Sequence, residues 1–456
     1  MTFQKNLWVL ALSGAMPLVS AHAQSTADLK KEIDALKAQL QILQQKVEAV
    51  AAQPDVTPLT QQVNRLEQRL DIAGDEAEKS GFKGMKINGT IETALKYNNI
   101  DKSNDFSASA GNNGGEYGML QITKESQDGE GIDWTLRLLP GASSLVHEAS
   151  MSVPLDKENR LIGGFMPDFQ GYEFAFANSN STLGNQFITH NALYDLAGAT
   201  AYTGLGMSHT LGGGAVALKW LVGNVDTASD STGTTFSAPS YDVTTGLKTD
   251  PVPSASALGS TAKSVALAYR ADWTINDTST IGLSGLHGAM NRSFNILTVD
   301  GGCIRGDWQF NGQLTAGQME RAAANGGTAR WTGLSAFMAY KIVPRLQLLA
   351  RADFIDNRDN GGGTYADNGG GSGNGLGPEG LDATGSFAYD ETTGVATRGA
   401  NLLRYSLGTN YQVNSNTQWK TEYRLDQSTG YNFLGSDGVT YQKDKTTVST
   451  SVVLSF

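Results

Sequence analysis

The sequence predicts a transmembrane β-barrel of about sixteen antiparallel strands, preceded by an N-terminal α-helical coiled coil. Three observations predict this fold. Apolar and polar residues alternate in steps of two over segments of about ten residues, the length of a tilted membrane-spanning strand. Short turns and long loops alternate between these segments. The last segment keeps its alternation up to an aromatic end, Phe456.

Residues 1–23 have the features of a secretory signal peptide. Lys5 supplies the positive charge, Leu7–Val19 supplies the apolar core, and Ala21-His22-Ala23 is an A-x-A cleavage site. No later window supplies the roughly 18 continuous apolar residues that a membrane-spanning helix needs. We therefore expect the mature chain to enter a membrane, if it does so, as strands.

Residues 24–73 have the heptad pattern of a coiled coil. Apolar residues from Leu29 to Val50 are spaced alternately by four and three residues, and the pattern resumes from Leu59 to Leu70 after a proline-containing break. Such a seam needs partner chains, but its mixture of Ile, Leu and Val does not fix their number. The alternative is a single amphipathic helix that lies on the barrel or on peptidoglycan. Residues 74–84 form a polar linker.

Residues 85–456 form the predicted barrel. The expected short turns lie at 127–131, 156–159, 212–214, 276–278, 305–307, 343–345 and 414–416, and the longest connections at 98–115, 171–191, 226–261, 356–400 and 427–444. In outer-membrane barrels the short turns face the periplasm and the long loops face outward. Without the strand pair around Cys303 the barrel would have fourteen strands.

The alternation is clearest in residues 401–456. Tyr405 and Leu407 share one face of a strand, whereas Arg404 and Ser406 share the other. Lipid next to the first face and water next to the second would suit the side chains of both faces. An open sheet edge in hydrocarbon would leave backbone groups unpaired at several kcal/mol each, so the last strand must pair with the first.

These features resemble outer-membrane porins of Gram-negative bacteria, whose last strand ends in phenylalanine and serves as the signal for insertion. The segment FMAYKIVPRLQLLARADFIDNR, residues 337–358, looks like one found in a family of functionally uncharacterised Gram-negative outer-membrane proteins. The whole mature chain resembles the DcaP-like trimeric porins, which join a periplasmic coiled coil to a sixteen-stranded barrel. The resemblance implies a homotrimer in the cell outer membrane, with its coiled coil in the periplasm.

Charged residues of the strands should point into the water-filled lumen, because Lys or Arg facing lipid at mid-height costs about 2–4 kcal/mol. By parity, the predicted pore-lining bases are Lys86, Lys96, Arg137, Lys219, Arg270, Arg351, Arg404, Lys420 and Arg424. The predicted inward acids are Glu92, Asp133, Asp272, Asp353, Glu422 and Asp426. This surplus of bases predicts a preference for small anions such as carboxylates. The alternative is that opposite charges pair across strands and only stiffen the wall.

The third outer loop, residues 171–191, is rich in aromatic residues. In porins generally the third loop folds inward and narrows the channel. The resemblance therefore implies Tyr172, Phe174, Phe176 and His190 as residues of the constriction. The alternative is that these rings only pack the loop against the wall.

The formal net charge of -11 argues against nucleic acid as a partner. The chain has no Gly-x-Ser-x-Gly, His-Glu-x-x-His or phosphate-loop motif, and we expect no catalytic residue, metal or cofactor. The sequence thus predicts a porin for passive diffusion, in contact with outer-membrane lipid, lipopolysaccharide and small anionic solutes, with peptidoglycan as a further partner of the helices. The alternatives are an outer-membrane enzyme and a structural tether between the outer membrane and the cell wall.

Overall fold

The computed structural model describes residues 34–35, 37–39, 41–42, 84–100, 104–108, 118–126, 131–139, 145–173, 186–197, 201–225, 235–236, 240–241, 248–249, 253–254, 265–289, 293–320, 323, 327–363, 376, 379, 398–435 and 440–456. The chain divides into two compact units, Met1–Gly84 and Met85–Phe456. In the first unit, the seven residues described between 34 and 42 are helical. The predicted signal peptide and nearly all of the predicted coiled coil and linker lie outside the described residues. No helix among the described residues is long and apolar enough to cross a membrane.

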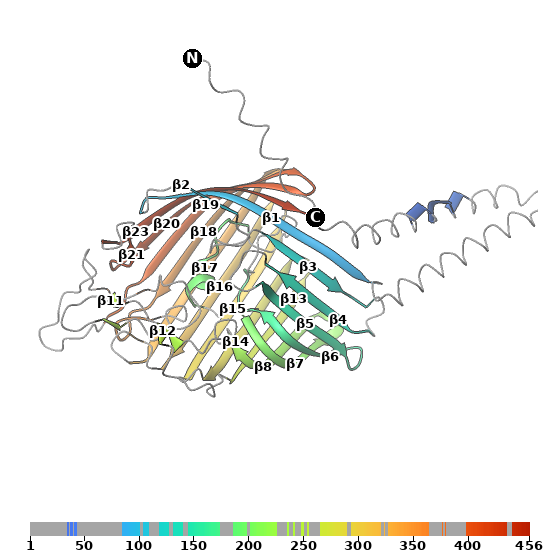
Figure 1. The fold of residues 1–456 in the computed structure, drawn as a ribbon, viewed down its shortest axis with the longest axis horizontal. Coiled ribbons are helices and arrows are strands. Elements are labelled where there is room, and N and C mark those ends of the chain that lie inside the picture. The colour runs from blue at the N-terminus through green and yellow to red at the C-terminus, as the bar shows by residue number, and fades with distance from the viewer. Residues whose placement is uncertain are drawn as a thin grey trace, which may run out of the picture. The chain divides into compact units, whose positions relative to one another are not determined.

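The second unit is a closed antiparallel barrel with sixteen strand positions, which confirms the predicted number and excludes fourteen (Figure 1). Two short strands, β2 and β3, pair with successive halves of β1 and share one position. The first strands are β1 (Met85–Asn98), β2 (Asn104–Ala108), β3 (Met119–Lys124), β4 (Asp133–Leu138), β5 (Val146–Pro154), β6 (Asn159–Pro167), β7 (Ala201–Leu211) and β8 (Val216–Val225). The others are β13 (Val265–Asn276), β14 (Ser279–Ala289), β15 (Ser293–Arg305), β16 (Trp308–Met319), β17 (Ala329–Val343), β18 (Leu346–Asp356), β19 (Leu402–Asn414), β20 (Thr417–Ser428) and β23 (Asp444–Ser455).

Smaller elements accompany the barrel. They are α3 (Ala192–Ala197), the 3-10 turn η1 (Gly212–Gly214), and the two-residue strands β9 (Thr235–Phe236), β10 (Ser240–Tyr241), β11 (Lys248–Thr249), β12 (Pro253–Ser254), β21 (Phe433–Leu434) and β22 (Tyr441–Gln442). The two-residue strands form isolated pairs in the connections, outside the main sheet.

The last strand closes the barrel against the first. β23 pairs with β1 from Thr90 to Asn98, and Phe456 and Gly89 exchange backbone hydrogen bonds of 2.9 and 3.0 Å. Figure 1 shows this seam, where the strands at the two ends of the colour scale lie side by side. Closure pairs the backbone groups that an open edge would expose to hydrocarbon.

Apolar side chains cover the outer face of the wall. Along β17, Leu334 and Met338 are exposed, whereas Trp331, Ser335 and Phe337 on the opposite parity are buried. Near the short turns the outer face also carries exposed aromatic residues: Trp273, Trp308, Tyr340, Tyr411, Trp419 and Phe456. Aromatic side chains gather in this way at membrane–water interfaces. The pattern fits a barrel with lipid outside and polar groups inside.

The predicted short turns at 212–214, 276–278, 305–307, 343–345 and 414–416 each join two paired strands, as does 156–159 between β5 and β6. The strand pair around Cys303 is therefore real: β15 and β16 pair from Phe294 to Arg305. The strands differ in length. β4 has 6 residues, and β2 and β3 share one position with 5 and 6 residues, whereas β13 to β20 have 11 to 15.

Candidate functional site: the barrel lumen

The described residues of the connection between β6 and β7 lie inside the barrel. We call these residues, 168–173 and 186–197, the inner loop. The Tyr172 hydroxyl lies 2.7 Å from the Ser335 hydroxyl on the inner face of β17. Helix α3 packs against β16, β17 and β18, and a Cβ added at Gly333 would collide with Leu193. The glycine therefore makes room for the helix against the wall.

Arg351 on β18 is the central anchor of the inner loop. Its guanidinium donates to the Glu173 carboxylate at 2.7 Å, to the Thr189 carbonyl at 3.2 Å and to the His190 carbonyl at 2.7 Å. The Arg351 side chain is 0% exposed. A planar guanidinium has five N–H donors, so one buried side chain can hold several points of a loop.

One wall carboxylate and a second arginine extend this attachment. Glu422 on β20 accepts hydrogen bonds from the backbone N–H groups of Ile188 and Thr189 at 2.9 and 2.8 Å, and from the Thr189 hydroxyl. Arg404 on β19 donates to Asp195 at 2.8 Å and also pairs with Asp426. Hydrogen bonds with an ionised partner are about twice as strong as neutral ones. The attachment therefore fixes the loop to β18, β19 and β20.

Five of the nine predicted pore-lining bases contact the inner loop or lie beside its attachment, four of them on β18 to β20 and Arg270 on β13. Arg270, Arg351, Arg404 and Lys420 donate to the inner loop, and Arg424 pairs with Asp426 beside them. All five also have acidic neighbours. Arg270, for example, lies 2.8 Å from Asp300. These bases are matched by acids, only some of which the sequence pattern revealed. Because the charges are paired and buried, they add little to the electrostatic field in the open lumen.

The other four predicted bases lie apart. Lys86 is exposed at the short-turn end and pairs with Glu125. Lys96 lies on β1 and is partly buried. Lys219 has its ammonium 4.3 Å from the centre of the Phe169 ring, at the start of the inner loop. Arg137 on β4 pairs with Glu148 on β5 at 3.0 Å.

The strands β4 to β6 carry ion pairs that remain partly exposed. The Arg137 side chain is 21% exposed, and the Arg160 side chain, which pairs with Asp133 at 2.6 Å, is 22% exposed. Sequence reasoning missed Arg160. Its strand begins Asn-Arg-Leu-Ile-Gly-Gly, where apolar residues follow one another and no alternation assigns a face. Its proximity to the predicted turn at 156–159 was the only available signal.

Of the four predicted constriction residues, the structure describes two. Phe174 and Phe176 lie outside the described residues. Tyr172 packs against the buried cluster of Phe187, Phe337, Ala339 and Leu349, and the His190 ring lies 4.3 Å from the Tyr194 ring, centre to centre. Both described side chains thus contact the loop or the wall.

Burial and neighbouring charges shift the pKa values of the two acids in the inner loop. Burial raises the pKa of Glu173 to about 7, against the opposing effects of Arg351 and the Asn191 N–H group. Burial alone would also raise the pKa of Asp195, but Arg404 and His190 hold it below its usual value. Glu173 is a further residue that the sequence did not single out, because a lone acid in a polar loop carries no pattern.

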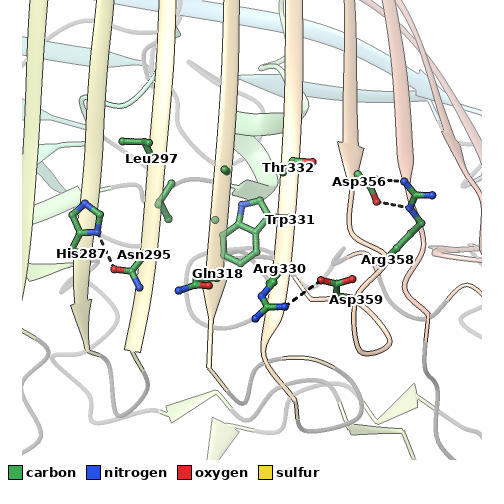
Figure 2. A pocket seen from close by; sticks show the side chains of 13 residues that line it. His287, Asn295, Leu297, Gln318, Arg330, Trp331, Thr332, Asp356, Arg358 and Asp359 are labelled. Atoms are coloured by element: carbon green, nitrogen blue, oxygen red, sulfur yellow. Dashed lines mark hydrogen bonds and ion pairs between the residues drawn. The ribbon is translucent and has the colours of Figure 1, made fainter.

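A depression of about 640 Å³ lies on the outer side of the wall, where β14 to β18 approach their loop ends. Those of its polar residues that lie on strands have outward parity. Figure 2 shows Arg330 facing Asp359, with an ion-pair distance of 3.8 Å, beside the pair of Arg358 and Asp356. His287 Nδ1 lies 2.9 Å from Asn295 Oδ1 at the other end. Because it faces outward, this depression does not belong to the lumen.

The second unit matches the model of a protein family over residues 121–456, whose description is "Protein of unknown function (DUF3138)". No curated protein matches the chain. Among solved structures, an anion-selective porin from Comamonas acidovorans is 12% identical, with 82% of this chain and 99% of that chain covered and a TM-score of 0.50.

Two other structures are similar over the same share of this chain. OmpT of Vibrio cholerae is 11% identical over 97% of its length, with a TM-score of 0.48. The outer-membrane channel DcaP of Acinetobacter baumannii is 11% identical over 97% of its length, with a TM-score of 0.46. At such identities the likeness concerns the fold. The chain belongs to the DUF3138 family, and its barrel has the architecture of outer-membrane porins.

Proposed function

We propose that this protein is an outer-membrane porin that lets small solutes, preferentially anions such as carboxylates, diffuse passively through its barrel. One observation carries the proposal. A loop inside a closed barrel is tied to one side of the wall, while charged side chains on the other side stay partly exposed. Such an arrangement narrows a lumen without sealing it and leaves charges in contact with passing solutes.

The anion preference follows from the charges on β1 to β8. Among the described residues there, the partly exposed charges that face the lumen beyond its short-turn rim are the bases Lys96, Arg137, Arg160 and Lys219 and the acids Asp133 and Glu148. Bases therefore exceed acids. A basic surplus in a narrow aqueous path raises the local concentration of anions, and this small surplus favours a modest selectivity.

We also propose how the protein assembles and what surrounds it. Three copies would associate, with the helices of residues 24–73 in the periplasm and the long loops outside the cell. Outer-membrane lipid, including lipopolysaccharide, would contact the apolar belt, and the outward depression at Arg330 would lie at the level of the headgroups. Peptidoglycan is the partner that helices on the periplasmic side could reach.

The test is reconstitution of the purified protein into planar bilayers. We expect stepwise increases of conductance in potassium chloride, and a reversal potential in a salt gradient whose sign reports anion preference. Bilayers that show no conductance steps would rule out the channel. Steps with cation selectivity would leave the channel and contradict the charge argument.

A further inference from the structure

A small cavity of about 210 Å³ lies at the short-turn end of the lumen, bordered by the inner loop. Six amide side chains from the inner loop and four strands line it: Gln186, Gln309, Gln347, Asn410, Gln412 and Gln418. The wall residues among them all have the inward parity of their strands. Pockets for drug-sized ligands measure about 300–1,000 Å³, so this cavity suits a smaller molecule.

Two of these amides have hydrogen-bonding capacity to spare. Gln309 and Asn410 are 5% and 3% exposed. The Asn410 amide nitrogen donates to the Gln186 carbonyl and side-chain oxygens at 3.0 and 3.1 Å. Within the described part of the chain, Gln309 Nε2 and Asn410 Oδ1 have no partner. One is a donor and the other an acceptor, and a hydroxyl group can satisfy both kinds.

The remaining polar residues of the cavity are charged and lie at its edge. Lys341 and Arg345 are exposed near the turn between β17 and β18, and Asp307 lies in the turn between β15 and β16. Neither base forms an ion pair with a described residue. The edge thus has one more base than acid, which attracts an anionic group, whereas the other lining residues are uncharged.

We infer that this cavity is a binding subsite for hydroxylated carboxylates, such as sugar acids. The hydroxyl groups bind the amides, and the carboxylate lies toward Lys341 and Arg345. This inference rests on the proposed function and narrows its solute class. Two extra hydrogen bonds to neutral groups correspond to an affinity gain of roughly ten-fold over a carboxylate without hydroxyl groups.

The experiment uses the full-length protein in planar bilayers with potassium chloride, to which gluconate or hexanoate is added on the side of the short turns. The measurement is the concentration of each anion that halves the chloride conductance. We expect gluconate to act at roughly ten-fold lower concentration than hexanoate. Gln309→Met keeps the side-chain size but removes the amide, and it should bring the two concentrations close together. Lys341→Met should weaken both anions alike.

The matched control is Gln318→Met, because Gln318 lies on the same strand with outward parity and should leave both concentrations unchanged. Where Gln309→Met fails to insert, Gln347→Leu tests the same group of amides. Equal concentrations for the two anions in the natural protein, or no response to the amide variants, would overturn the subsite while the channel stands. Absence of chloride conductance would instead overturn the proposed function.

Discussion

The two sides of the lumen hold their charges in different ways. On β18 to β20, Arg351 and Arg404 are buried by the inner loop and matched by acids from both the loop and the wall. On β4 to β6, Arg137 pairs with Glu148 on the next strand and Arg160 pairs with Asp133 two strands away, and the two arginine side chains stay 21% and 22% exposed. Side chains of the same parity and type thus serve attachment on one side and remain available to solutes on the other. Whether the inner loop buries a side chain decides which of these two roles it has.

The largest effect should come from removing the central anchor. Arg351→Met removes the cation paired with the buried Glu173 carboxylate and takes one donor each from the Thr189 and His190 carbonyls, which should lower the free energy of unfolding by about 3–5 kcal/mol. Equilibrium unfolding in detergent, followed by tryptophan fluorescence, measures the change. Arg160→Met is the matched control, and its partly exposed pair should contribute only about 0–1 kcal/mol. Equal losses for the two variants would remove the distinction between the two sides.

A smaller effect is expected from the acceptor on β20. Glu422→Gln keeps the shape but loses the charge and one acceptor oxygen, so the backbone N–H groups of Ile188 and Thr189 are held less firmly. We expect a loss of about 1–3 kcal/mol. Hydrogen exchange of these two amides should become faster, while exchange in β4 and β5 should not change. Unchanged protection of both amides would show that Glu422 does not hold the loop.

The pH dependence of stability should report Glu173. Its pKa is raised from 4.5 to about 7, so between these values the folded state holds a proton that the unfolded state has released. The free energy of unfolding should therefore fall as pH rises from 4.5 to about 7 and level off above that value. Glu173→Gln should flatten this part of the profile. A free energy of unfolding that rises between pH 4.5 and about 7 in the natural protein, but not in Glu173→Gln, would contradict the assignment.

Substitutions on β4 to β6 should have the smallest effect on stability and a clear effect on ion selectivity. Arg137→Gln removes one exposed positive charge and should shift the reversal potential in a salt gradient toward cations, with a stability change of less than about 1 kcal/mol. Arg424→Gln removes a positive charge that is less exposed, at 10% against 21% for Arg137, and it should move the reversal potential less. A larger shift for Arg424→Gln would reverse the comparison.

The barrel could be predicted from sequence because each strand carries its own evidence. Where a strand alternates, parity assigns each residue to a face, as Leu334 and Ser335 illustrate, and a short turn fixes the register of each hairpin. The pair β15 and β16 was predicted in this way from weak alternation. The faces of Arg351 and Glu422 were predicted by the same rule.

The partners of these side chains could not be predicted. Thr189 and Glu422 are separated by 233 positions in the sequence, and no periodic pattern connects a loop to a distant wall. The count of inward bases and acids also omitted Glu173 and Asp195, because loops have no parity. A charge census of a barrel from its strands alone therefore overstates the charge available to solutes.

The seam between β1 and β23 sets the order of assembly. Asn98 pairs with Thr447, so this contact joins the first and last strands of the barrel. Its entropy cost of loop closure is the highest of any strand pair in the barrel. Hairpins such as β15 with β16 join neighbouring residues and can form early. The sheet should therefore grow from local hairpins, and the barrel should close last, when β23 pairs with β1. Deletions in β23 should leave an open sheet.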